Sequence, residues 1–490
     1  MLAKPLVGKY ILDTLSIGMY NNPLVLFREY IQNSADAIDD AIEKETLSPE
    51  AARIDIALDG RRRSIIIRDN GSGISLRRVS SSLHDLGKSE KRPDINRGFR
   101  GIGRLGGLGY CETLRFITKA KGEAEYSISQ WDCLKLRQLI SERSGALDAS
   151  SIIQEIVDFQ QQQYAGHLSD QFFCVEMLNV MNTRNVLLHV PLVKSYLAQI
   201  APVPFDSKIF SYSETIDEEM RRRVPGYKSY NVFLNNDKIV KPYADSVPVG
   251  KSLRDPVTDV EFFELNSNAS ALAVGWLGKH NYFGSINTTS SMDGIRIRSG
   301  NILIGDNYTL SHLFRERRFN NYLVGELHIV NSELLPNSRR DDFEDNAAKD
   351  EFYSIFIKEI GIPFSKKIRE ASKLRSLTNL DSHRKRVIKS ANEIAKKGHL
   401  SQSQKATVLR SLKALSNNGR LLNNKIDSLT KKVEGSKHLL DTEKFSKLNG
   451  NRSLLKNVFE TIYRKSTDKE AAETIVKAIV SKVVSQQGAS

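Results

Sequence analysis

The stretch REYIQNSADAI at residues 28–38 has the pattern of an amphipathic helix with a polar stripe. Glu29, Asn33 and Asp36 are separated by four and then three residues, which on a helix places them on one face about one turn apart. The opposite positions are mostly apolar, so this side of the helix is expected to pack against a sheet. The polar stripe must then face either a cleft or water. If the helix stood alone, a solvated face would be the simpler interpretation.

Two glycine-rich segments follow this helix. The β-branched run at residues 64–69 predicts a buried strand that ends in the turn DNGSG, residues 69–73, where backbone comes close to another group. A second glycine cluster, at residues 98–109, precedes the strand-like run 113–118. The glycines of interest are Gly71, Gly73, Gly98, Gly101 and Gly103.

The helix, the turn and the glycine cluster, in this order, resemble the nucleotide site of the GHKL ATPases. These include type II topoisomerases, the ninety-kilodalton heat-shock chaperones, histidine kinases, MutL and MORC proteins. Residues 15–38 are most similar to the HtpG-like heat-shock chaperones and to MORC proteins. The resemblance covers residues 1–360, and it is strongest over residues 1–120. It implies an ATPase, a hydrolase with ATP and Mg²⁺ as cofactors.

The residue types suit this chemistry. Asn33 offers a hard, neutral oxygen to Mg²⁺, and Glu29 is placed to orient and deprotonate the water that attacks the γ-phosphate. Asp69 would accept a hydrogen bond from the adenine amino group, and the glycine cluster would offer backbone N–H groups to the phosphates. The candidate cofactor-binding residues are Asn33, Asp36, Asp69, Gly71, Gly73, Lys88, Gly98, Gly101, Gly103 and Thr183, with Asn33 as the metal ligand.

Two of these candidates come from the resemblance alone. Lys88 lies in LGKSEK, residues 86–91, which is similar to the Gly-Lys-Ser element of MORC and chaperone lids. Thr183 aligns with the threonine that shares a water with the adenine-binding aspartate, although the family's preceding glycine is Asn182 here. Residues 183–190 are predicted to close the domain as a strand, after a helix-like insertion at residues 130–175.

The second domain is predicted as an α/β domain with β-rich runs at 230–234, 271–277, 294–298 and 322–330. The loop LLPNSRRDDF at residues 334–343 resembles the chaperone loop whose arginine reaches the γ-phosphate. Arg339 and Arg340 are alternatives for that role, because the loop is one residue shorter than the chaperone pattern. Alternatively, the Asp341-Asp342 pair holds the start of a helix.

Three other interpretations fit less well. LGKSEK lacks the glycine that a Walker A loop needs five residues before Gly87. GIGRLG at residues 101–106 satisfies the dinucleotide fingerprint, but the preceding segment is charged and contains Pro93, where a Rossmann fold needs a hydrophobic strand. A sensor kinase carries its histidine helix before the ATPase domain, whereas this site begins within the first forty residues.

The last quarter of the chain holds all the excess positive charge. Residues 365–490 contain 28 Lys and Arg against 11 Asp and Glu, whereas the remainder has 44 against 47. Leucine, isoleucine and valine recur there at helical spacing, which predicts helical hairpins or a coiled coil. Such a region would meet nucleic acid, an acidic protein or a membrane surface, or be simply a solvated helical surface.

The whole chain is therefore predicted to be an α/β (α+β) protein of three parts. Residues 1–200 form a GHKL α/β sandwich (Bergerat fold), residues 201–364 a transducer-like middle domain, and residues 365–490 a basic helical domain. Neither a signal peptide nor a membrane-spanning run is evident, so a soluble, cytoplasmic protein is expected. Three cysteines without a CxxC pair argue against a disulfide framework or a zinc site.

Two functions remain open. One is a chaperone-like ATPase clamp, a homodimer that closes on a protein client. The alternative is a MORC- or topoisomerase-like clamp that acts on nucleic acid through the basic region. A non-hydrolysing ATP switch is disfavoured by Glu29.

Overall fold

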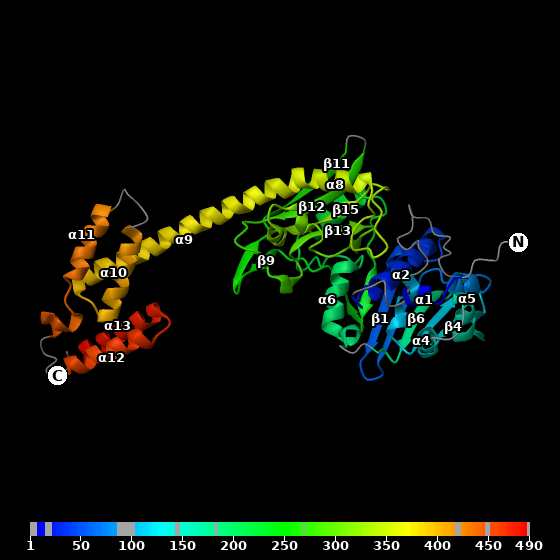
Figure 1. Ribbon diagram of the computed structural model, residues 1–490, viewed down its shortest axis with the longest axis horizontal. Helices are drawn as coiled ribbons and strands as arrows, with labels where there is room; N and C mark the ends of the chain where they lie inside the picture. Colours follow the sequence, from blue (N-terminus) through cyan, green and yellow to red (C-terminus); the bar gives the residue numbers. More distant parts are fainter. Residues whose placement is uncertain are drawn as a thin grey trace. The chain divides into compact units, whose positions relative to one another are not determined.

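The computed structural model of the protein describes residues 7–14, 22–85, 103–142, 148–181, 185–267, 270–416, 423–445 and 451–487. The chain divides into two compact units, Met1–Ala371 and Ser372–Ser490. Both sheets that matter for the site lie in the first unit (Figure 1). In the described part of the chain, no helix is both long enough and apolar enough to cross a membrane.

An eight-stranded mixed sheet forms the first half of unit Met1–Ala371. Its strand order is β5-β4-β3-β6-β2-β1-β7-β8, and all neighbours are antiparallel except β1 and β7. The strands are β1 (Arg53–Asp59), β2 (Ser64–Asp69), β3 (Thr113–Lys119), β4 (Glu125–Asp132), β5 (Val157–Gln163), β6 (Phe172–Leu178), β7 (Asn231–Leu234) and β8 (Asp237–Lys238). The strands predicted at residues 64–69 and 113–118 are thereby confirmed.

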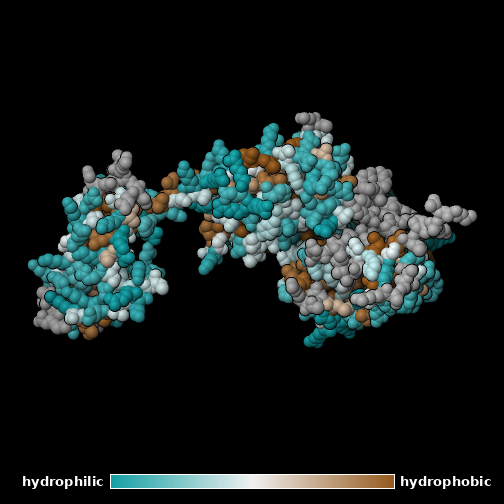
Figure 2. Space-filling model, in the orientation of Figure 1, coloured by the Kyte–Doolittle hydropathy of each residue, from teal (hydrophilic) through white to brown (hydrophobic). Residues whose placement is uncertain are grey.

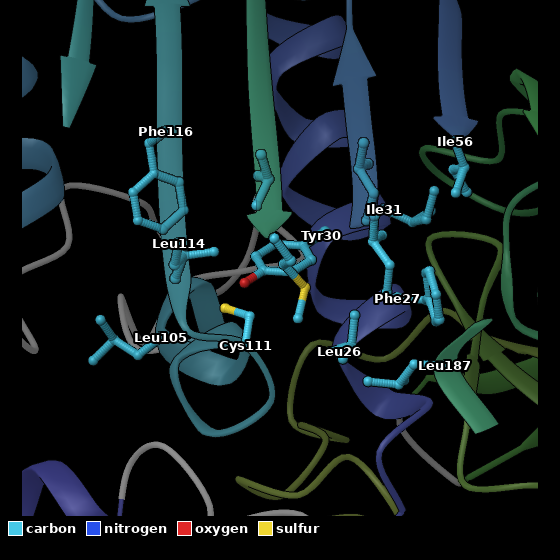
Figure 3. Packing of buried hydrophobic residues seen from close by; sticks show 14 of the residues in the cluster. Leu26, Phe27, Tyr30, Ile31, Ile56, Leu105, Cys111, Leu114, Phe116 and Leu187 are labelled. Carbon is cyan, nitrogen blue, oxygen red and sulfur yellow. The ribbon is translucent and has the colours of Figure 1, made fainter. Parts of the chain in front are cut away.

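Helix α2 (Val25–Glu43) covers one face of this sheet, as its apolar side predicts. Phe27 and Ile31 of α2 are fully buried and share one apolar core with the strand residues Ile56 and Leu114 (Figure 3). The smaller helices of this half are α1 (Tyr10–Asp13), α3 (Val79–His84), α4 (Cys133–Ser141), α5 (Ala149–Ile156), α6 (Val190–Ile200) and α7 (Ser213–Arg223), with 3₁₀ helices η2 (Pro49–Ala51), η3 (Gly103–Gly109) and η4 (Val186–Leu188).

Two sequence-based assignments in this half are wrong. Residues 186–188 form the turn η4 and α6 begins at Val190, so the described residues 185–190 do not form the strand that was expected over residues 183–190. Pro191 in the first turn favours a helix start, and the His189 side chain accepts a hydrogen bond from Leu192 N. The strand that lies in the middle of the sheet is β6, whose residues 172–175 fall within the predicted insertion and whose residues 176–178 follow it.

The second error concerns the run at residues 230–234, which was assigned to the second domain. It is β7, and it pairs in parallel with β1 in the first sheet. Asn235, immediately after β7, also bonds to β1, because its side chain accepts from Leu58 N at 2.8 Å. The first sheet therefore extends beyond residue 200 to Lys238.

A five-stranded sheet of order β11-β12-β15-β13-β14 forms the second half of this unit, and α8 and the start of α9 lie along it (Figure 1). The predicted runs at 271–277, 294–298 and 322–330 are confirmed as β12, β13 and β15. The strands of this sheet are β11 (Asp259–Asn266), β12 (Ala271–Lys279), β13 (Gly294–Ser299), β14 (Ile302–Ile304) and β15 (Val324–Ile329), and β9 (Ser246–Val249) and β10 (Leu253–Pro256) form a separate two-stranded antiparallel sheet. The helices are η5 (Thr288–Ser290), η6 (Ser311–Leu313), η7 (Arg317–Tyr322), α8 (Ala347–Phe356) and the π-helical turn η8 (Ile357–Gly361).

The second unit is helical, as predicted. Its helices pack as the hairpins α10–α11 and α12–α13 around two small apolar cores, so hairpins are found where a coiled coil was the alternative. The helices are α9 (Ile362–Lys397), which begins in the first unit, α10 (Gln402–Ser416), α11 (Asn423–Glu434), η9 (Leu439–Asp441), η10 (Glu443–Phe445), α12 (Arg452–Lys465) and α13 (Lys469–Gln487). All three cysteines of the chain are free and buried.

Candidate nucleotide site

Glu29 lies on the first half of α2 with only 7% of its surface exposed. Gly103 of η3 lies against it, because a Cβ atom at residue 103 would come within 2.5 Å of Glu29 Oε2. The other carboxylate oxygen, Oε1, is 3.7 Å from Nε of Arg28 and 3.7 Å from Nε of Arg340. Among the described residues no group donates a hydrogen bond to Oε1. The carboxylate is thus held near two cations while one oxygen stays uncommitted, an arrangement suited to orienting a water molecule.

Asp69 is the last residue of β2 and is buried. Its Oδ1 accepts a hydrogen bond from Gly71 N at 2.9 Å, which closes the turn. Gly71 lies against α2, since a Cβ there would be 2.6 Å from the carbonyl carbon of Ala37. Gly73 has φ +63° and its Cβ position is blocked by Lys119 O. Both positions therefore require glycine, as the turn pattern predicted.

Asn33 and Asp36 follow Glu29 on α2. Asp36 is buried, whereas Asn33 is half-buried, and its amide forms no hydrogen bond with the described residues. A free side-chain amide oxygen is a suitable ligand for Mg²⁺, which usually binds one or two protein oxygens together with phosphate oxygens and waters. The described residues contain no cluster of three or more His, Cys, Asp or Glu side chains that would hold a metal by itself. Asn33 is therefore a candidate ligand by its residue type and partial exposure.

The loop after β15 brings Arg340 to Glu29. The Arg340 side chain is 11% exposed and its backbone has φ +53°, whereas Arg339 is exposed. The loop is held by Arg28, whose Nη2 donates to Arg339 O at 2.7 Å and whose Nη1 donates to Arg340 O at 3.1 Å. Of the two arginines, Arg340 is the one whose side chain meets the carboxylate.

The alternative role for the Asp341-Asp342 pair does not match the geometry. Helix α8 is capped by Asn346, whose side chain accepts from Lys349 N at 2.9 Å. Asp342 instead binds the Lys349 ammonium group at 3.0 Å and the Tyr353 hydroxyl.

Four predicted site residues, Lys88, Gly98, Gly101 and Thr183, lie outside the described residues. Conversely, sequence reasoning missed Arg28, Tyr30 and Thr118. Thr118 is buried on β3; its hydroxyl accepts from Ile74 N at 2.8 Å and donates to Phe172 O at 3.1 Å, which ties the Asp69 turn to β6. Their types alone gave no signal, because arginine, tyrosine and threonine are common at such positions and only their tertiary contacts distinguish them.

Comparison with known proteins bears on the segment that holds α2 and the Asp69 turn. Residues 24–163 match the family described as histidine kinase-, DNA gyrase B-, and HSP90-like ATPase. These residues form a GHKL-type ATPase domain. The GHKL domain contains α2, the Asp69 turn, η3 and strands β1 to β5.

The chain is also similar to heat-shock chaperones. It is 29% identical over 137 residues to the chaperone protein HtpG of Orientia tsutsugamushi (strain Boryong), which covers 24% of this chain and 22% of that protein. It is 32% identical over 106 residues to the endoplasmin homolog of Leishmania donovani, with coverages of 20% and 14%. It is 25% identical over 199 residues to HtpG of Wigglesworthia glossinidia brevipalpis, which covers 37% of this chain and 29% of that protein. The matched regions thus span less than a third of each relative.

Proposed function

We propose that the chain binds ATP and hydrolyses it between α2, the Asp69 turn and Arg340, as a chaperone-like clamp. The observation that carries the proposal is the meeting of Arg340, from the second half of the unit, with Glu29 of the GHKL domain. A γ-phosphate beside this pair would contact a base and a cation at once. Phosphoryl transfer needs little else from a protein than positioning and stabilisation of charge.

Each residue has a separate role in this proposal. Asp69 accepts a hydrogen bond from the adenine amino group, and Asn33 holds Mg²⁺ beside the phosphates. Glu29 orients the attacking water and accepts its proton. Arg340 stabilises the charge that develops on the γ-phosphate, and η3 supplies backbone N–H groups. When bound, Mg²⁺ would supply positive charge that offsets the charge of the phosphates.

The test separates binding from turnover. Glu29→Ala is expected to keep ATP binding and to lose hydrolysis by at least about 100-fold, the factor typical of a general base. Asp69→Asn is expected to lose binding itself. The matched control is Glu43→Ala, an exposed glutamate at the end of the same helix. Normal hydrolysis by Glu29→Ala in a steady-state phosphate-release assay would refute the assignment.

The clamp is proposed to be a homodimer that closes on a protein client. Support comes from the similarity to HtpG, which is named as a chaperone protein. Light scattering of the full chain with and without a non-hydrolysable ATP analogue, and with an unfolded model client, tests both parts. A monomer under all conditions would contradict this proposal without affecting the ATPase assignment.

Nucleic acid is the second candidate partner, favoured by one feature of α9. A shallow hollow of about 430 Å³ is lined by Lys385, Ile388, Lys389, Asn392, Glu393, Lys396 and Lys397. The surrounding surface is mostly hydrophilic (Figure 2). If these lysines neutralise phosphates of duplex DNA, the logarithm of affinity falls against the logarithm of salt with a slope of about −0.9 per phosphate. Absence of binding to labelled DNA at low salt would leave the protein client as the proposed partner.

A further inference from the structure

The hydroxyl of Tyr30 joins α2 to the glycine-rich helix η3. It accepts a hydrogen bond from Gly107 N at 3.0 Å and donates to Arg104 O at 3.1 Å. The tyrosine is buried, with its ring in the apolar core beside Leu114 and Cys111 (Figure 3). The approach is close, because a Cβ atom at Gly107 would lie 2.5 Å from the hydroxyl oxygen. Tyr30, which directly follows Glu29 in α2, thus contacts η3.

The same segment of η3 is anchored on its other side by Arg104. Its Nη2 donates to Asp85 O at 2.6 Å and its Nε to Leu83 O at 3.3 Å, at the end of α3. Burial lowers the pKa of the guanidinium to about 10. Arg104 is the cation nearest in sequence to Gly103, yet its donors bind carbonyl groups of α3. The Arg104 carbonyl is the group that accepts from Tyr30, so α2, η3 and α3 are linked through one residue.

We propose that Tyr30 is a positioning residue whose hydroxyl fixes η3 on α2 and thereby sets how far the phosphate-binding N–H groups lie from the Glu29 carboxylate. The reason is the spacing along η3. Gly103 touches Glu29 and Gly107 touches Tyr30, so two successive residues of α2 hold both ends of a five-residue stretch. This inference rests on the proposed function, in which the backbone N–H groups of η3 bind the phosphates of ATP.

Loss of the Tyr30 hydroxyl is expected to weaken binding of the phosphate groups and to leave binding of the adenine base unchanged. The adenine-binding end of the proposed site is formed by the Asp69 turn, which packs on Ala37. Ala37 lies two helical turns from Tyr30 along α2. Phenylalanine at position 30 would keep the buried ring and lose both hydrogen bonds. Gly107 N and Arg104 O would then lack this partner, which loosens η3 without disturbing Asp69.

The experiment is calorimetric titration of the full chain with ATP and, separately, with adenosine. Tyr30→Phe is expected to bind ATP about tenfold more weakly than wild type, the effect of about two modest hydrogen bonds, and to bind adenosine as wild type does. Tyr126→Phe is the control, because it removes another tyrosine hydroxyl that bonds to Gln162 at the exposed edge of the same sheet. Equal losses for ATP and adenosine, or no loss for either, would overturn the inference.

A second variant tests the contact from the other side. Gly107→Ala places a methyl group against the Tyr30 hydroxyl and is expected to show the same selective loss of ATP affinity. In the Tyr30→Phe background the obstructing oxygen is gone, so the added effect of Gly107→Ala should be smaller than in wild type. Strictly additive effects would contradict the contact. A wild-type chain that binds adenosine normally but not ATP would overturn this inference, whereas one that binds neither ligand would refute the proposed function first.

Discussion

At the scale of single residues, Arg28 distinguishes this site from a bare carboxylate on a helix. Its guanidinium donates to two consecutive carbonyl groups, those of Arg339 and Arg340, and its Nε lies 3.7 Å from Glu29. A planar guanidinium presents its donors in a rigid fork that fits these contacts, whereas an ammonium group presents three donors from a single atom. Arg28 therefore positions the loop that presents Arg340.

Arg28→Lys is expected to lower kcat about tenfold while changing ATP affinity little, because the loop is loosened but the base-binding end is intact. Steady-state hydrolysis and equilibrium binding of ATP measure the two effects. Arg62→Lys, in the exposed hairpin after β1, is the control. A matching fall in ATP affinity would mean that Arg28 acts on the nucleotide itself.

At the scale of elements, helix α2 is the common support of the site, and Gly71 shows how tightly the Asp69 turn packs on it. Gly71→Ala is expected to destabilise the protein by about 1–3 kcal/mol, because its Cβ must displace the Ala37 backbone. Nucleotide affinity should fall with it. Gly60→Ala is the control, since nothing lies within 4 Å of that Cβ position. Thermal unfolding of both variants provides the comparison, and equal midpoints would contradict the described packing.

A buried histidine pair links two segments of the second unit. His399 and His438 form a backbone bridge and their rings lie 5.3 Å apart. Burial lowers the pKa of both histidines, and the neighbouring charge of His438 contributes to the lowering for His399, whose pKa falls to about 4. The charged groups that act on the pair are Lys405, Asp441, Lys456 and Glu460.

This pair predicts how stability changes with pH. Unfolded histidine titrates near pH 6.5, so the unfolded unit binds more protons than the folded unit as pH falls from about 6.5 towards 4, and stability is lost across that window. Hydrogen exchange of the full chain at pH 7 and pH 5, corrected for intrinsic rates, should show faster opening around residues 399–440 at the lower pH. His399→Gln with His438→Gln should reduce the difference, and the exposed His383→Gln should not. Identical protection at both pH values would disprove the prediction.

At the scale of the whole molecule, hydrolysis is expected to need both halves of the first unit. A fragment cut at residue 200 would lose β7 and β8 from the first sheet, so the test uses the full chain. Arg340→Ala should retain ATP binding and reduce hydrolysis about 100-fold, whereas Arg339→Ala, with its exposed side chain, should have little effect. The reverse order of effects in the phosphate-release assay would assign the role to Arg339.

The N-terminal segment is the expected site of ATP-dependent dimer contact. Leu12 is buried and Lys9 Nζ donates to Leu139 O at 2.9 Å, but Tyr10 and Ile11 remain 64% and 40% exposed. Replacing both exposed residues by serine should reduce ATP-dependent compaction in small-angle scattering without unfolding the chain. The control is Leu253→Ser, an exposed leucine on β10. Unchanged compaction would give these residues no role in the partner contact.

The sequence alone determined the parts of the protein that depend on local pattern. The spacing of Glu29, Asn33 and Asp36 predicts one helical face, and the glycines at 71 and 73 predict a close turn after a buried strand. These features can be predicted from the sequence because helical periodicity and the steric freedom of glycine act within a few residues. The same holds for the helical C-terminal region, whose apolar spacing is local.

Tertiary structure decided what depends on contacts between distant segments. Residues 231–234 look like any strand in the sequence, and only pairing with β1 assigns them to the first sheet. Arg339 and Arg340 cannot be told apart in the sequence, because they are neighbours in one loop. In the structure Arg340 has a positive φ, its carbonyl group accepts a hydrogen bond from Arg28, and its side chain lies beside Glu29. Tyr30 likewise acquires a role only through Gly107, 77 residues away. Strand pairing and side-chain contacts of this kind are set by the packing of the whole unit, which local pattern does not encode.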